Sequence, residues 1–70
     1  MMPLSMASMG EINTIKSLHG KEETIRFIES LGFAVGSEVS IVSKLGGNVI
    51  VSVKGSRVAL SRSMASQIHI

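Results

Sequence analysis

Two stretches of alternating apolar and polar residues, 37–42 and 48–53, flank a glycine pair and constrain the fold more than any other feature of the chain. In the first stretch Val39 and Ile41 share one face, and in the second the valines recur at every other position. A period of two residues is typical of a strand with one buried face. A connection rich in Gly and Asn tolerates the positive φ that tight hairpins need. The pattern therefore predicts an antiparallel hairpin in a sheet with one covered face.

A helical period precedes the hairpin. Ile25, Ile28 and Leu31 recur at three-residue spacing, and Phe27 lies four residues before Leu31. This spacing predicts an amphipathic helix over residues 21–31. The glutamates of its first turn complement the positive end of the helix dipole.

Glycines separate the predicted elements. Gly32 follows the last apolar helix position, where a left-handed cap is expected, and Phe33 can fold back onto the last helical turn. We interpret five glycines as backbone turns, because glycine adopts positive φ without a steric penalty. They are Gly32, Gly36, Gly46, Gly47 and Gly55.

The residues before the helix are less regular. Residues 11–18 are rich in strand formers and are predicted as one strand, but Ile12 and Ile15 are three residues apart. A bulge, or burial on both faces, would reconcile this spacing with a strand. Residues 1–10 are rich in Met and Ser, and they either cover one end of the core or form a frayed tail.

Three further short elements follow the hairpin. Residues 57–60 alternate as a third strand, residues 61–65 can close one helical turn with Ser61 as its N-cap, and residues 67–70 alternate again. We predict a single domain, residues 1–70, that is mainly β. Its architecture is a small closed or nearly closed barrel of about five short strands, with one inserted α-helix and a short C-terminal helical turn.

Composition narrows the compartment and the partners. The chain has no Cys, which excludes disulfides and thiolate metal sites and favours a reducing cytoplasm. No apolar run approaches the roughly 20 residues of a membrane-spanning helix, and the N-terminus lacks the basic start of a signal peptide. The basic residues are scattered and there is no Trp or Tyr to stack on bases. We therefore expect a soluble cytoplasmic protein that neither inserts into membranes nor binds nucleic acid.

Residues that carry chemistry are sparse. His19 and His69 lie in different predicted elements without Cys or Asp beside them, so we interpret them as a loop residue and a terminal-strand residue. No serine sits in a Gly-x-Ser-x-Gly turn, and the glycines around Phe33 form neither a phosphate loop nor a dinucleotide fingerprint. The five glutamates are expected on solvated helix and strand faces. We predict no catalytic residues, no cofactor and no metal ligands, so the protein is not expected to be an enzyme.

Function is then expected to lie in a surface. Ile50 points opposite to the inward valines of its strand, and Val42 points opposite to Ile41. Val35 and Leu45 fall in predicted turns. Exposed together, these four would form an apolar patch that marks a partner interface. In the alternative interpretation, Val42 and Ile50 pack under the helix or the N-terminal segment.

Taken together, these segments resemble the FeoA family, the small accessory proteins of bacterial ferrous iron uptake. The similarity covers essentially the whole chain in the right order and spacing. Its most specific parts are the Leu-Gly-Phe-x-x-Gly element at 31–36 and the Gly-x-x-Val-Ala-Leu strand at 55–60. The other matching segments are Pro3-Leu4-Ser5, Gly10, Asn48-Val49-Ile50-Val51-Ser52-Val53 and Ala65-Ser66-Gln67-Ile68. The hairpin departs from the family pattern, because Gly46-Gly47-Asn48 stands where a proline commonly precedes the return strand.

The resemblance implies an SH3-like barrel and a role beside FeoB, the ferrous iron transporter with a cytosolic GTP-binding domain. Members of the family are thought to act by protein contact, so no catalytic role carries over to a residue of this chain. The same fold is similar to the C-terminal domain of iron-dependent repressors of the DtxR type, which leaves a regulatory module as the alternative function. Self-association is also compatible with a small barrel that has a spare strand edge.

Overall fold

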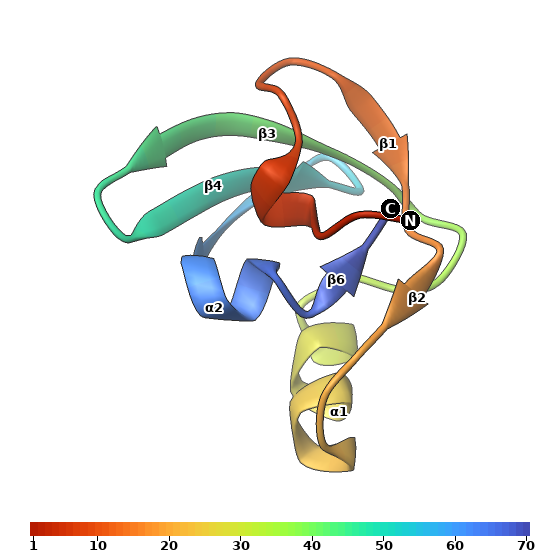
Figure 1. Ribbon diagram of the computed structural model, residues 1–70. Helices are drawn as coiled ribbons and strands as arrows, with labels where there is room; N and C mark the ends of the chain where they lie inside the picture. The colour runs from red at the N-terminus through yellow and green to blue at the C-terminus, as the bar shows by residue number, and fades with distance from the viewer.

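The computed structural model describes residues 1–70 and is built mainly of short strands (Figure 1). In chain order the elements are η1 (Leu4–Met6), β1 (Ile12–Thr14), β2 (Ser17–Leu18), α1 (Glu22–Ser30), β3 (Glu38–Leu45), β4 (Asn48–Val53), β5 (Ser56–Ser61), α2 (Arg62–Ala65) and β6 (Ile68–His69). The mainly β architecture with one inserted helix and a short C-terminal helical turn is confirmed. There are six strands rather than five, because the stretch predicted as one strand over residues 11–18 forms two strands, β1 and β2.

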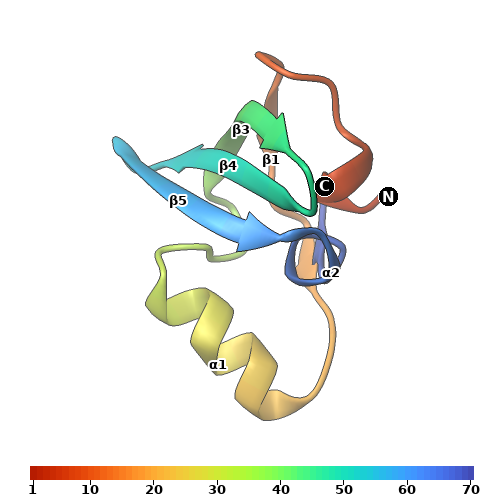
Figure 2. The ribbon, with the colours of Figure 1, turned by 90° about the vertical axis from the view of Figure 1, so that its left-hand side faces the viewer.

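Four strands form one antiparallel sheet in the order β1-β3-β4-β5, and β2 pairs with β6 in a second small sheet. The β3–β4 hairpin turns at Gly46, which has a φ of 58°. The β4–β5 hairpin turns at Lys54 and Gly55, both with positive φ. In Figure 2, η1, α1 and α2 lie on one side of the large sheet, and no element lies beyond its other face.

The prediction of one strand over residues 11–18 is wrong, because the chain changes sheets at Ile15. Ile12 pairs with β3 and is 69% exposed, whereas Ile15 is buried. The Ile15 N–H donates to the Ser37 carbonyl at 2.9 Å, and the next residue, Lys16, donates its N–H to the His69 carbonyl at 2.7 Å. The three-residue spacing of the two isoleucines therefore reflects a corner between β1 and β2 rather than a bulge within one strand.

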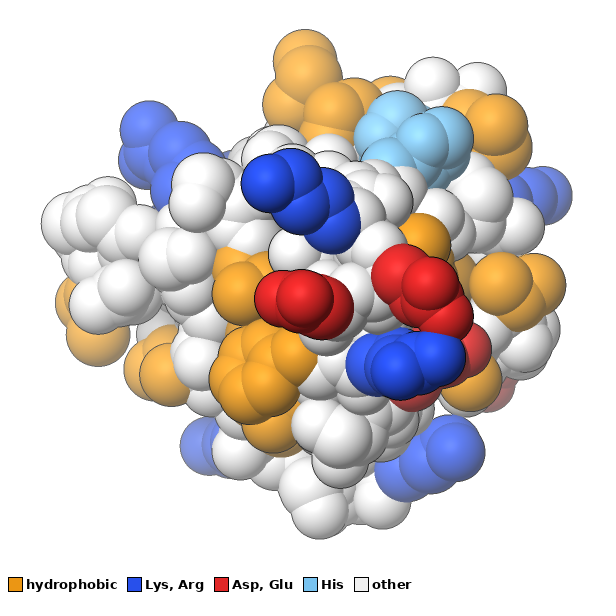
Figure 3. Space-filling view, turned by 90° about the horizontal axis from the view of Figure 1, so that it is seen from below, with side chains coloured by type: hydrophobic (Ala, Val, Ile, Leu, Met, Phe, Trp, Pro, Cys, Tyr) orange, Lys and Arg blue, Asp and Glu red, His pale blue; other side chains and the backbone are white.

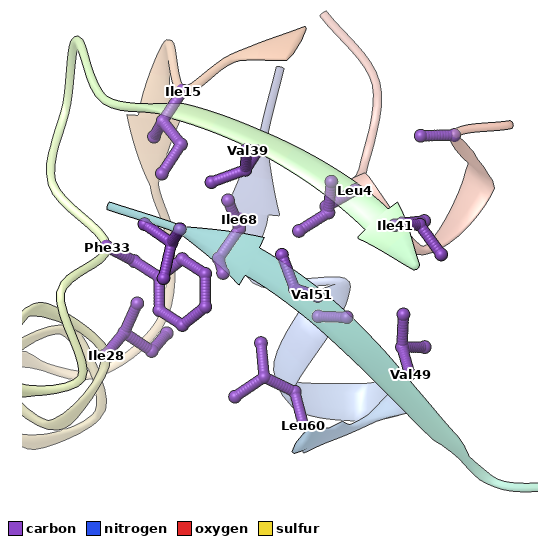
Figure 4. Packing of buried hydrophobic residues seen from close by; sticks show 13 residues of the cluster. Leu4, Ile15, Ile28, Phe33, Val39, Ile41, Val49, Val51, Leu60 and Ile68 are labelled. Atoms are coloured by element: carbon purple, nitrogen blue, oxygen red, sulfur yellow. The ribbon is translucent and has the colours of Figure 1, made fainter. Parts of the chain in front are cut away.

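The core consists entirely of apolar side chains. It takes Val49, Val51 and Val53 from β4 and Ile28 and Phe33 from the helix and its exit. Figure 4 shows the Phe33 ring next to Ile28, with Val51 and then Val49 farther from the ring along β4. The remaining members are Leu4, Ala7, Ile15, Val39, Ile41, Leu60, Ala65 and Ile68. The sequence indicates the strand and helix members of this set through their periodicity.

The N-terminal segment covers one end of this core rather than fraying. Leu4 is completely buried. Met2 and Ile70 exchange two backbone hydrogen bonds, Met2 N–H to Ile70 O at 3.0 Å and Ile70 N–H to Met2 O at 2.9 Å. Pro3 forms an isolated bridge with His69, so the two chain ends lie side by side (Figure 1). The alternative of a frayed tail is excluded for these residues.

The exit of α1 is a hydrogen-bonded cap. Gly32 has a φ of 103° and donates its N–H to the Glu29 carbonyl at 3.0 Å, while Phe33 donates to the Ile28 carbonyl at 3.3 Å. This pair of bonds is the Schellman arrangement, and the buried Ile28 and Phe33 side chains supply its hydrophobic contact. Phe27, predicted on the apolar face of the helix, is 51% exposed, so that face is narrower than the sequence suggests.

Candidate interaction surface

The face of the large sheet turned away from the core is set by the alternation of β4. Val49, Val51 and Val53 are buried, so Ile50 lies on the opposite face, where it is half-buried. Ile50 faces Ser43 across the β3 pairing and Ala59 across the β5 pairing. The alternative in which Ile50 packs under the helix or the N-terminal segment does not hold, because those elements lie on the core side of the sheet (Figure 2).

A β-bulge decides the position of Val42. The register of β3 against β4 shifts between Ile41 and Ser43, so Val42 is the extra residue. Ile41 is buried, whereas Val42 is exposed. In a bulge, two residues of one strand lie opposite a single residue of the neighbouring strand. Val42 therefore lies next to Ser43, which pairs with Ile50. The bulge therefore adds an apolar side chain beside Ile50 on the free face.

Leu45 extends the same region at the end of β3. It pairs with Asn48 at the tip of the β3–β4 hairpin and is 63% exposed. The Arg62 N–H donates to the Gly47 carbonyl at 2.8 Å and holds the hairpin tip, while Lys44 makes a long contact from Nζ to the Ser5 carbonyl at 3.5 Å. Leu45 thus lies on an anchored hairpin rather than on a free loop.

One residue outside the predicted patch joins this region. Ile12 is opposite Ser40, two positions before Val42 along β3, and its side chain is exposed. Ser40 pairs with Ser52, which alternates with the buried valines of β4, so Ile12 lies on the same face of the sheet as Ile50. Met9 is also exposed, but it bridges Ile41, whose side chain faces the core, so Met9 does not belong to this region. The three-residue spacing of Ile12 and Ile15 is the only sequence signal that Ile12 lies outside the core.

We call this set the outer apolar surface, defined as Ile12, Val42, Leu45 and Ile50. Val35, the fourth residue predicted for the interface, does not belong to it. Val35 is 64% exposed, but it lies in the loop before β3, whereas Leu45 ends that strand. The structure therefore brings together three of the four predicted residues and places Val35 at the opposite end of β3.

A shallow polar hollow of about 700 Å³ borders the outer apolar surface at Ile12. The hydroxyls of Ser40 and Ser52 lie in its lining, and Glu38 and Lys54 add one charge of each sign. Thr14, Gly36, Ser37, Val39 and Gly55 complete the lining. Open to solvent and rich in hydroxyls, the hollow suits polar side chains of a partner at the rim of an apolar contact.

The chemistry-bearing side chains are few in the folded chain. No group of three or more His, Cys, Asp or Glu residues comes together in an arrangement that would hold a metal ion. Arg26 and Glu22 form the single ion pair, which is exposed on one face of α1. The two histidines, predicted in separate elements, become neighbours through the β2–β6 pairing. None of the helices has the length and apolar character needed to cross a membrane.

Comparison with known proteins gives one consistent result for the fold. The FeoA domain family matches residues 2–70 of the chain. A protein of Methanocaldococcus jannaschii named Fe(2+) transport protein A is 31% identical over 70 residues, which make up 100% of this chain and 85% of that protein. The crystal structure of Stenotrophomonas maltophilia FeoA complexed with zinc is 29% identical with a TM-score of 0.85, covering 99% of this chain and 88% of that one.

That S. maltophilia protein is described as an SH3 domain protein, which confirms the SH3-like architecture expected here. A manganese-dependent transcriptional repressor in complex with manganese also superposes, with a TM-score of 0.88 at 19% identity. The superposition covers 96% of this chain but 34% of the repressor. At this identity the likeness concerns the fold alone.

Proposed function

Because the chain belongs to the FeoA domain family, we propose that it is an accessory protein of ferrous iron uptake that acts by contacting a FeoB-type transporter on its cytosolic side. The family supplies the connection to ferrous iron transport. Contact with the transporter requires an interaction surface on this protein. The outer apolar surface is the observation that supports this contact.

The outer apolar surface has the properties of an interface centre. Its exposed members come from β1 and β3, and the register of the sheet places them on the same face as Ile50 of β4. Exposed apolar side chains gathered on one face favour burial against a partner, whereas scattered ones need no explanation. The polar hollow beside Ile12 supplies hydroxyls and charges of the kind found at interface rims.

The test is a titration of the purified protein against the GTP-binding domain of its own transporter, and then against the full transporter in detergent. Saturable binding to either supports the proposal. Leu45→Glu is expected to weaken binding about tenfold, since residues at the centre of an interface commonly contribute more than about 1 kcal/mol. Leu45 is 63% exposed, so its replacement is expected to leave the melting temperature unchanged.

Val35→Glu is the matched control, because Val35 is equally exposed but lies at the opposite end of β3. It is expected to bind as the unaltered protein does. Equal losses for the two variants would indicate a charge effect rather than a docking site. No binding to the domain or to the full transporter would remove the proposal.

A regulatory module like that of metal-dependent repressors is the second candidate, favoured by the superposition on the manganese-dependent repressor. In that repressor the matching part is 34% of the chain, so the fold there accompanies other domains. The two candidate functions are distinguished by the partner that the protein binds. If the transporter does not bind but a repressor of the same cell does, the regulatory alternative takes precedence.

A further inference from the structure

The small β2–β6 sheet brings the chain's two histidines into contact on the surface. Ser17 pairs with His69 in this sheet, and His19 donates its backbone N–H to the Gln67 carbonyl at 2.7 Å. The two imidazole rings have centroids 4.0 Å apart and an interplanar angle of 37°. In Figure 3 the histidine side chains are seen side by side on the surface of the molecule.

The same face carries a hydrogen-bond chain that includes the His19 ring. The Ser17 Oγ lies 2.9 Å from the His19 Nε2, and it also donates to the Met1 Sδ at 3.7 Å. A hydroxyl has one hydrogen to donate. If that hydrogen is directed at the Met1 sulfur, the Ser17 oxygen must accept from an Nε2–H of His19. The Nδ1 of His19 then keeps its lone pair.

The other face of the small sheet explains why the rings stay at the surface. Leu18 pairs with Ile68, and Ile68 is completely buried while Leu18 packs against the core. Strand alternation then directs Ser17, His19 and His69 outward together. The core thus holds the two strands that carry the imidazoles.

We propose that His19 and His69 form a binding site for a divalent first-row transition-metal ion. The His19 Nδ1 and one ring nitrogen of His69 are the protein ligands, Ser17 orients His19, and water completes the coordination. Imidazole nitrogen suits Zn²⁺, Ni²⁺, Cu²⁺ and Fe²⁺. Two nitrogens that share an ion at roughly 2.0–2.1 Å in a tetrahedral site lie little more than about 3 Å apart. The ring centroids of two imidazoles on such an ion lie about 5 Å apart, so the two rings must separate by about 1 Å from their present 4.0 Å and turn one nitrogen each toward the ion.

This site does not depend on the contact with the transporter. The outer apolar surface lies on the large sheet, whereas the histidines lie on the small one. Each proposal can therefore fail without the other. The chain contains only these two histidines, so one site per chain is expected and every imidazole signal can be assigned to it.

The test is calorimetric titration of the untagged protein with Zn²⁺. One ion per chain is expected. His19→Asn and His69→Asn are each expected to weaken binding by at least about tenfold, since loss of even an outer-shell partner commonly does so. Melting curves of both variants establish that they are folded. Glu38→Gln, an exposed carboxylate on β3 in the large sheet, is the control and is expected to bind Zn²⁺ as the unaltered protein does.

Ser17→Ala tests the orienting role, because it keeps both ligands and removes the partner of the Nε2–H. It is expected to weaken Zn²⁺ binding less than either histidine substitution does. It is also expected to redistribute the His19 tautomers in long-range ¹H–¹⁵N spectra. Binding that survives both histidine substitutions, or no saturable binding at all, would overturn the proposal. A stoichiometry of one ion per two chains would overturn a site contained within one chain.

Discussion

At the scale of single residues, Gly32 is required for its backbone conformation and not because the space around it is too small for a side chain. Its φ of 103° lies in the region that side chains with a Cβ avoid. A Cβ placed on Gly32 would meet only the Val53 Cγ1 at 3.8 Å, which is an ordinary van der Waals contact. The space is therefore available, and the penalty for any other residue arises from the backbone conformation.

We expect Gly32→Ala to lower the free energy of unfolding by about 1 kcal/mol, and Gly32→Val to lower it further because a β-branched residue adopts positive φ less readily. Gly47→Ala is the matched control. Gly47 lies in a turn without a positive φ, and a Cβ there would meet nothing within 4 Å. Chemical denaturation measures all three. A Gly32→Ala protein as stable as the Gly47→Ala protein would contradict the role assigned to the cap.

At the scale of elements, the sequence predicts what is local and misses what depends on distant pairing. The helix with its glycine cap and the β3–β4 hairpin follow from neighbours within a few residues. The break between β1 and β2 does not, because β1 is defined by pairing with β3 and β2 by pairing with β6 at the far end of the chain.

The same distinction holds for the candidate surface. Val42, Leu45 and Ile50 were predicted from alternation and turns within one hairpin. Ile12 joins them only through the pairing of β1 with β3, which no local pattern reveals. The contact between the two histidines is likewise a product of the β2–β6 register.

The corner between β1 and β2 makes two isoleucines in one short stretch respond differently to truncation. Ile15 is buried, so Ile15→Ala is expected to lower the free energy of unfolding by about 2–5 kcal/mol through lost burial and a residual cavity. Ile12 is 69% exposed, so Ile12→Ala is expected to change it by less than about 0.5 kcal/mol. Urea titration of both proteins measures the difference. Equal effects would indicate one continuous, equally buried strand over residues 11–18.

At the scale of the whole molecule, stability depends on closure of the core by the N-terminal segment. A domain of this size has a free energy of unfolding of roughly 4–10 kcal/mol, from about 0.05–0.15 kcal/mol per residue. Leu4 is completely buried in η1, which packs against α2, and its neighbour Pro3 bridges His69 of β6. The Met2–Ile70 hydrogen bonds hold that segment against the C-terminal strand. The burial of the Leu4 side chain therefore accounts for a large share of the free energy of unfolding.

Leu4→Ala is expected to lower the free energy of unfolding by about 2–5 kcal/mol and so to reduce the melting temperature strongly. Met6→Ala, in the same 3-10 turn but exposed, is the control and is expected to melt like the unaltered protein. The Leu4 variant should lose transporter binding only in proportion to the fraction unfolded, whereas Leu45→Glu should lose binding while it remains folded. Calorimetry of folding and binding on the same samples separates these two mechanisms. A Leu4→Ala protein of unchanged stability would mean that the N-terminal segment does not close the core in solution.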